Sequence, residues 1–351
     1  MSLVNALLNG GTVGAADVDV TRYGHSSAPR IAMESAAELH EIFMESFYNV
    51  EQAELAAATE GVALEGSQYE AVAEAAIKNA ATKIKEFLQK LWAKVKAFFH
   101  NIKRYLDSIF MSGADFVKKY QKEIDKMGKL EDYTVKMYNY DDDEIDSVVE
   151  VNVEDTANEL LKGYGLSIDK AKDDMLSKAE KETIESPNDL DMEKLRDDIA
   201  TKLSGGKCKE YDEFEKWCFG AFRNGAEGSD DKEDRDINGS DVERFAKILA
   251  GSKKLASKVD SMASKTDSAY SKAVKVVGDC EKALDKVKDN KNAVNLSKTM
   301  RQYSTTISTC QSMVNTKFNA WKAVIKERDS VYKQVIMGAF SNAKKTAKAD
   351  K

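Results

Sequence analysis

Residues 77–110 combine a periodic apolar side with a dense set of cationic side chains. They hold eight Lys or Arg residues against two acids, which gives a formal charge of +6. Apolar residues recur at intervals of three and four, the period of one face of an α-helix: Ile84, Leu88, Leu91, Val95, Phe98, Ile102, Leu106 and Ile109. Cations on such a helix can bind nucleic-acid phosphates or an acidic protein surface. We therefore predict a polyanion-binding set: Lys83, Lys85, Lys90, Lys94, Lys96, Lys103 and Arg104.

Two other interpretations of residues 77–110 depend on which side of the helix is exposed. Trp92, Phe98 and Phe99 stand among the lysines, which is typical of a helix at the surface of an anionic membrane. Alternatively, the apolar side packs in the protein core and the lysines only face water. Joint exposure of the aromatic residues would favour the membrane, because monomers seldom expose a large apolar patch without a use for it. A buried apolar side would leave the lysines to bind a polyanion.

Residues 234–239 match the first half of a calcium-binding EF-hand loop. Asp234, Asp236 and Asn238 supply oxygen ligands at positions 1, 3 and 5, and a glycine stands at position 6. Position 12 requires a bidentate Glu, but Phe245 stands there. We therefore expect no calcium binding at this segment.

The sequence contains no signature of a catalytic or nucleotide-binding site. Neither a phosphate-binding loop of the GxxxxGK[ST] or GxGxxG type nor a GxSxG nucleophile motif occurs. The three histidines are too dispersed for a histidine zinc site: His25, His40 and His100. The four cysteines lack CxxC spacing and are expected to be reduced thiols. We therefore predict a non-enzymatic protein without a metal ion or a cofactor.

Charge is strongly segregated along the chain, although the net charge is only −7. Residues 1–76 carry −10, residues 111–240 carry −15, and residues 241–351 carry +12. The acidic and basic parts can pair with one another, or the basic parts can face an anionic partner. No apolar stretch approaches the roughly 18 residues that a transmembrane helix requires.

The elements that would position these side chains are mainly α-helical, and we predict a multi-helix bundle. Four regions follow from composition: a flexible acidic N-terminal segment, a basic amphipathic helical region, an acidic mixed region and a basic helical hairpin. They span residues 1–65, 66–130, 131–240 and 241–351. The first long helix should end near Gly113, since glycine is common just after a helix.

Two hairpins are predicted inside these regions. Residues 241–351 contain two long runs of three-four apolar spacing joined by a polar turn, which predicts a long antiparallel helical hairpin. Phe318, Trp321 and Ile325 should be buried against its first helix. Alternating β-branched and aromatic residues predict a small β-hairpin near 133–153. A Ser240-x-x-Glu243 capping box should open the helix that follows the EF-hand-like segment.

Two short stretches before the basic helix look alike. They are Ala32-Met33-Glu34-Ser35 and Ala63-Leu64-Glu65-Gly66, in sequence of the kind that proteases cut. Each resembles the small-x-Glu and Leu/Ile-x-Glu sites cut by the prohead proteases of large tailed bacteriophages, although alanine replaces the strict Leu or Ile. An acidic, Ala/Glu-rich segment followed by a Lys/Phe/Trp helix is also similar to the inner-head and core proteins of those phages. The resemblance covers residues 31–110.

This resemblance implies a non-enzymatic virion structural protein inside the phage head. Its implied cleavage sites are Glu34-Ser35 and Glu65-Gly66, and its implied partners are a prohead protease, other virion proteins and packaged DNA. The implied location is the head interior, after assembly in the host cytoplasm. Cleavage after Glu65 would remove a segment with a formal charge of −8. The remaining product would have a net charge near +1 and would retain the basic helices. The alternative function is a membrane-associating protein that uses helix 77–110.

Overall fold

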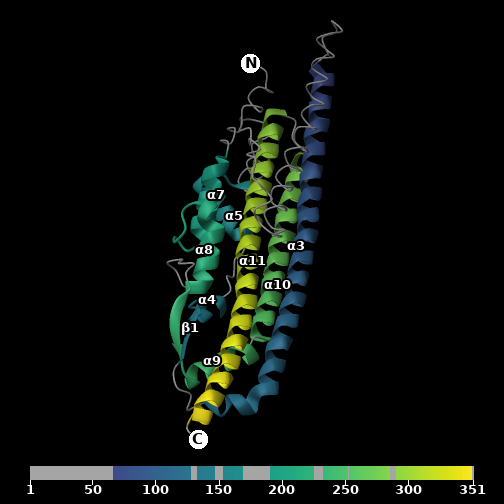
Figure 1. Cartoon of the computed structure of the whole chain (residues 1–351). Helices are drawn as coiled ribbons and strands as arrows, with labels where there is room; N and C mark the ends of the chain where they lie inside the picture. The colour runs from purple at the N-terminus through teal and green to yellow at the C-terminus, as the bar shows by residue number, and fades with distance from the viewer. Residues whose placement is uncertain are drawn as a thin grey trace, which may run out of the picture. The chain divides into compact units, whose positions relative to one another are not determined.

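The computed structural model describes residues 66–127, 133–146, 153–168, 190–224, 232–251, 253–284 and 290–349. These ranges are mainly α-helical and contain one two-stranded antiparallel sheet (Figure 1), so the predicted fold class is confirmed. In chain order the elements are α3 (Gly66–Ile124), β1 (Tyr133–Met137), α4 (Asp142–Asp146), α5 (Val153–Gly163), α7 (Met192–Leu203), α8 (Tyr211–Asn224), β2 (Glu233–Ile237), α9 (Gly239–Gly251), α10 (Lys253–Leu284) and α11 (Asn290–Ala349).

The chain divides into two compact units, and each unit is assembled from three separate stretches. The first unit comprises Met1–Lys94, Val151–Gly206 and Thr266–Asn315. The second comprises Val95–Glu150, Lys207–Lys265 and Thr316–Lys351. The long helices α3, α10 and α11 each give one part to the first unit and another part to the second.

In the first unit, parts of α3, α10 and α11 lie side by side (Figure 1) and share a core. The apolar residues that the sequence spaced by three and four are buried here: Ile84, Leu88 and Leu91 on α3, Tyr270 and Val277 on α10, and Leu296, Met300, Tyr303 and Ile307 on α11. The helices α5 and α7 pack on each other, and the Tyr164 hydroxyl donates to Asp198 Oδ2 at 2.7 Å.

The part of α11 in the first unit also buries many polar side chains, which the apolar pattern did not predict. These are Asn295, Ser297, Thr299, Gln302, Ser304, Thr306, Ser308, Gln311, Ser312 and Asn315. Some are satisfied within the helix itself. Thr299 Oγ1 donates to the Asn295 carbonyl at 3.0 Å, and Thr306 Oγ1 donates to the Gln302 carbonyl at 2.9 Å. Such bonds to the preceding turn let hydroxyl groups enter a core without a partner from another element.

In the second unit, β1 pairs with β2. The antiparallel register places Tyr133 opposite Ile237 and Met137 opposite Glu233. The predicted strand at 133–137 is therefore correct, but its partner lies about one hundred residues further along the chain. Of the expected second strand, residues 147–152 lie outside the described residues and Val153 begins α5.

The helix α3 continues through Gly113 to Ile124, so the predicted end at Gly113 is wrong. Gly113 is buried, and a Cβ placed on it would lie 2.9 Å from the carbonyl oxygen of Leu249 in α9. This glycine therefore permits a close approach of two helices in the second unit and does not end a helix.

The C-terminal helical hairpin is formed by α10 and α11, and its predicted core residues are buried. Phe318, Trp321 and Ile325 are at most 3% exposed. Two of these residues also contact other elements of the second unit. Trp321 Nε1 donates to the Ile145 carbonyl of α4 at 2.8 Å, and the Phe318 ring meets Phe99 of α3 at a centroid distance of 5.4 Å.

We expect Gly113→Ala to lower the free energy of unfolding by about 1–2 kcal/mol. The new Cβ would collide with backbone, and overpacking of this kind costs about 1–3 kcal/mol. The gain in helix propensity offsets at most about 1 kcal/mol. Chemical denaturation measures the difference. The matched control is Gly251→Ala at the end of α9, where a Cβ meets nothing within 4 Å, and which should leave stability unchanged or slightly higher. Equal effects of the two substitutions would contradict the close approach.

Candidate functional site

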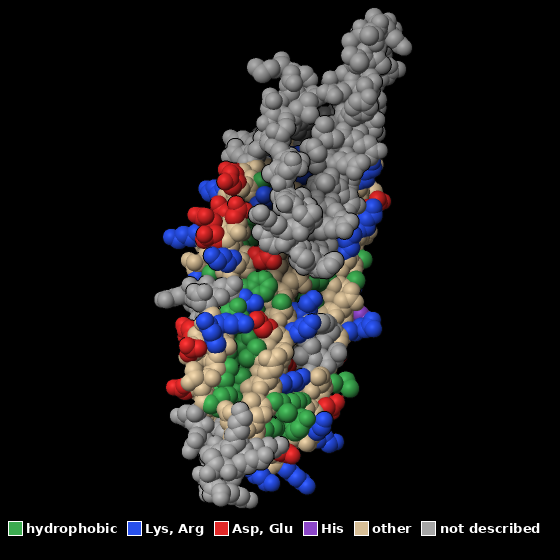
Figure 2. Space-filling model, viewed as in Figure 1, with side chains coloured by type: hydrophobic (Ala, Val, Ile, Leu, Met, Phe, Trp, Pro, Cys, Tyr) green, Lys and Arg blue, Asp and Glu red, His purple; other side chains and the backbone are tan. Residues whose placement is uncertain are grey.

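The apolar side of α3 is buried, and its lysines stand in two rows on the flanks of that side. Ile84, Leu88, Leu91, Val95, Phe99 and Ile102 are at most 3% exposed. One row holds Lys85, Lys96 and Lys103, spaced by eleven and seven residues, and the other holds Lys83, Lys90 and Lys94, spaced by seven and four. Spacings of four, seven and eleven return to the same side of an α-helix. Figure 2 shows Lys and Arg side chains (blue) along the margin on which α3 runs in Figure 1.

Acids of α10 pair with the first row. In the first unit, Lys85 Nζ lies 2.8 Å from Glu281 Oε2. In the second unit, Lys103 Nζ lies 2.7 Å from Asp260 Oδ2, and this hydrogen bond raises the pKa of Lys103. Two members of the predicted polyanion-binding set are therefore already matched with carboxylates of the same chain.

The second row holds lysines that reach the surface. Lys90 and Lys94 are exposed and Lys83 is half-buried, all on the part of α3 that belongs to the first unit. Lys96 and Arg104 are exposed on the part in the second unit. We call Lys83, Lys90 and Lys94 the basic row. Cations on one side of an α-helix give that side a positive potential that attracts polyanions.

Trp92, Phe98 and Phe99 of α3 are not exposed together, as membrane binding through them would require. Phe99 is 3% exposed and packs edge-on against Phe318 within the second unit. Phe98 is half-buried in the same unit. Trp92 is half-buried in the first unit, where its Nε1 donates to Asp267 Oδ1 at 2.9 Å. Within the described ranges, no helix combines the length and the apolar character that a membrane span requires.

The predicted cleavage residues lie almost entirely outside the described residues. Glu34, Ser35 and Glu65 are not among them, and Gly66 is the first residue of α3.

The EF-hand-like segment forms a strand and a helix cap. Asp234 and Asp236 belong to β2, where Asp236 Oδ1 accepts from the Thr134 hydroxyl at 2.7 Å. Asn238 Oδ1 caps α9 by accepting from the Asp241 amide at 3.1 Å, and Asp241 Oδ2 accepts in return from the Asn238 amide at 3.2 Å. The capping box is thus Asn238–Asp241, and the predicted pair Ser240–Glu243 is wrong by two positions. Among the described residues, no group of three or more His, Cys, Asp or Glu could hold a metal ion.

Sequence reasoning missed a buried charge cluster in the second unit. Arg328 of α11 is 1% exposed and lies between two carboxylates. Its Nη1 is 3.1 Å from Asp142 Oδ1, and its Nη2 is 3.1 Å from Asp329 Oδ1. Burial raises the pKa of both carboxyl groups, while the guanidinium opposes that shift. Arg328 occupies a core position between Ile325 and Tyr332 in the three-four rhythm, and this charged residue in an apolar row was the available signal.

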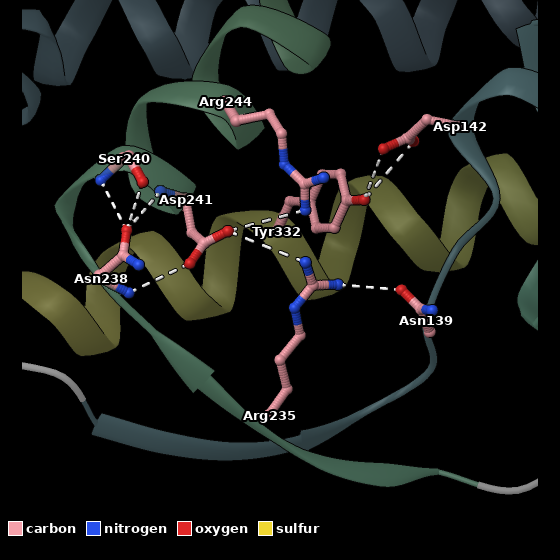
Figure 3. Close-up of polar contacts among 8 residues, drawn as sticks. All are labelled: Asn139, Asp142, Arg235, Asn238, Ser240, Asp241, Arg244 and Tyr332. Carbon is pink, nitrogen blue, oxygen red and sulfur yellow. Dashed lines mark hydrogen bonds and ion pairs between the residues drawn. The ribbon is translucent and has the colours of Figure 1, made fainter.

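Tyr332 belongs to the buried cluster, and a separate polar network lies beside it (Figure 3). The Tyr332 hydroxyl donates to Asp142 Oδ2 at 3.2 Å, and its ring stacks on Phe245 at a centroid distance of 4.0 Å. Asp241 of α9 lies 3.8 Å from both Arg235 of β2 and Arg244 of α9. These contacts involve residues of α4, α9, α11 and β2. Their chemistry is charge neutralisation inside the core, which is structural.

A comparison with protein-family models, curated proteins and solved structures gives no match to this chain. The functional argument therefore depends on the residues of the chain itself.

We expect Arg328→Leu to destabilise the protein by about 3–5 kcal/mol, because two buried carboxylates would lose their cation. Arg244→Leu is the matched control: the Arg244 side chain is 48% exposed, and exposed ion pairs contribute about 0–1 kcal/mol. Chemical denaturation of the two variants checks this, and a loss below about 1 kcal/mol for Arg328→Leu would show that the cluster is not a core element.

Asp329→Asn should change how stability depends on pH. Because burial raises the pKa of folded Asp329, the folded chain keeps a proton that the unfolded chain releases near its ordinary pKa of about 3.9. The parent should therefore lose stability relative to Asp329→Asn as the pH rises from about 4 to about 7. Denaturation of both proteins across that range measures the difference, and a constant or increasing advantage of the parent would contradict the raised pKa.

Proposed function

We propose that this protein is a non-enzymatic structural protein of a bacteriophage virion, inside the head, and that its basic row contacts packaged DNA or acidic virion proteins. The observation that carries the polyanion part is the arrangement of α3. Its apolar side is buried, and Lys90 and Lys94 are exposed on one flank of that side.

The virion part of the proposal rests on the sequence. The paired stretches that end at Glu34 and Glu65 resemble prohead-protease sites, and the segment before Gly66 carries −8. Removing that charge after assembly would leave a protein that is electrostatically compatible with DNA. The location would then be the head interior, with the host cytoplasm as the place of assembly and the prohead protease as a transient partner.

We expect full-length protein to bind a fluorescent DNA duplex in a salt-dependent manner, and the triple change of Lys83, Lys90 and Lys94 to Gln to weaken binding about tenfold or more at low salt. Each neutralised phosphate contributes about 0.9 to the slope of log affinity against log salt, so the slope should fall by about 2–3.

The matched control changes Lys118, Lys122 and Lys126 to Gln, since these three lysines are also exposed. The control removes the same charge and should retain most of the binding. Equal losses in the two variants would contradict a specific role of the basic row. Flotation with anionic liposomes that resists salt and disappears in Trp92→Ser would favour the membrane alternative.

Mass spectrometry of purified virions tests the location and the processing together. The mature chain should be present and should begin at Ser35 or Gly66. Abundant virion peptides that span both Glu34-Ser35 and Glu65-Gly66 would contradict processing, and the absence of the chain from virions would contradict the location.

A further inference from the structure

Three buried oxygen atoms of α11 lie in one row within the first unit. They are Ser297 Oγ, Ser304 Oγ and Gln311 Oε1, and each of these residues is at most 1% exposed. Within the part of the chain that the structure describes, no group forms a hydrogen bond with any of the three atoms. Steps of seven residues return to the same side of an α-helix, so the oxygens follow one line along α11. We call these three atoms the oxygen row.

Other buried hydroxyls of the same helix are satisfied without an outside partner. Thr299 Oγ1 and Thr306 Oγ1 donate to the backbone carbonyls four residues earlier. A serine in a helix can form the same bond, but the two serine hydroxyls of the oxygen row do not form it. The Gln311 amide nitrogen donates to Asn315 Oδ1 at 2.8 Å, which leaves the Gln311 oxygen in need of a donor.

A fourth buried oxygen belongs to Tyr270 of α10. Its hydroxyl also forms no hydrogen bond within the described ranges, and the residue is 1% exposed. Tyr270 lies fourteen residues before the end of α10 at Leu284, and Ser304 lies fourteen residues after the start of α11 at Asn290. Equal distances from the connection place the two residues at the same level of the helical hairpin. Burial raises the pKa of Tyr270, and the thiol of Cys310 on α11 is close enough to add to that shift.

These four oxygens require a partner of a particular chemistry. A buried polar group without a hydrogen bond loses the hydration that it had in the unfolded chain, and four such groups would remove much of a protein's small net stability. Gln311 Oε1 can only accept, whereas the three hydroxyls can donate and accept. Residues 290–326 of α11 contain no Asp or Glu that could balance a cationic ligand. A small neutral molecule that both donates and accepts hydrogen bonds fits all four atoms.

We propose that the first unit binds ordered water molecules at Ser297, Ser304 and Gln311, and that the Tyr270 hydroxyl contributes to the site at Ser304. Buried water typically forms about three hydrogen bonds with polar groups that would otherwise be unsatisfied. At a rise of about 1.5 Å per residue, successive oxygens of the row are about 10 Å apart, so each oxygen has its own water site. The water molecules allow α11 to be covered while it retains polar side chains. These sites are independent of the proposed function.

Water ¹⁷O magnetic relaxation dispersion on the full-length protein tests the proposal, because it counts water molecules that remain bound while the protein tumbles. One variant combines Ser297→Ala with Ser304→Ala. The matched control combines Thr299→Val with Thr306→Val, since these hydroxyls are also buried but donate to their own helix. We expect the serine variant to lose the signal of about two long-lived water molecules, and the threonine control to keep the signal of the parent. Circular dichroism checks that both variants keep their helical content.

Two results of this comparison would overturn the proposal. The first is a serine variant with the same long-lived water signal as the parent. The second is an equal loss in both variants, because the signal would then report a general loosening of the core. A high-resolution crystal structure of the parent protein gives an answer that does not depend on how the variants fold. Ordered water within hydrogen-bond distance of Ser304 Oγ and Gln311 Oε1 is expected, and protein atoms bonded to these oxygens, or no ordered water beside them, would contradict the water sites.

Discussion

Helix α11 is covered along much of its length, and this constraint determines how both units are built. Between residues 295 and 322 it has no exposed residue. A helix satisfies its own backbone, and a buried polar side chain costs free energy unless it also forms hydrogen bonds. In the first unit, the buried side chains of α11 include apolar residues and threonine hydroxyls that donate to backbone carbonyls of the preceding turn. In the second unit Arg328 pairs with Asp142 of α4 and with its own neighbour on α11, Asp329.

Burial of the apolar side of α3 also determines which of its side chains can contact a partner. An amphipathic helix has one apolar side, and here that side is used within the protein, with Leu88 fully buried in the first unit and Phe99 nearly so in the second. Its cations then remain on the flanks, where long lysine side chains can cover apolar surface and keep the charge in water. One flank is matched by carboxylates of α10. Lys90 and Lys94 on the other flank are exposed, and this exposure makes them candidates for contact with an outside partner.

Local patterns in the sequence predicted the helices and much of the core, because amphipathic spacing records which side of a helix is buried. The burial of Trp321 and the helical hairpin followed from that spacing. Interactions between distant segments did not follow. The strand at 133–137 was visible in its own residues, but its pairing with 233–237 depends on the tertiary fold. The sequence around Gly113 is compatible both with the end of a helix and with a close approach of the Leu249 backbone. Only the tertiary packing distinguishes the two roles.

The candidate site was predictable in part for the same reason. Helical spacing alone separates Lys83, Lys90 and Lys94 from Lys85 and Lys103, but the acids that match the second group, Glu281 and Asp260, lie far along the chain. Arg328 was detectable as a charge in an apolar row, yet its partner Asp142 belongs to a different element. Sequence periodicity therefore locates a charged side chain on a helix, and tertiary structure decides whether its charge is matched inside the protein.

Hydrogen–deuterium exchange on the full-length protein tests most directly whether α11 is the element on which both units depend. Amides in the most stable elements exchange only through global unfolding, whereas those in peripheral elements exchange through local opening. We predict that peptides covering residues 295–322 exchange most slowly in the described part of the chain, with an opening free energy equal to that of global unfolding. Faster exchange in α11 than in α3 or α10 would contradict the account, because the covered helix would then open while its neighbours remained folded.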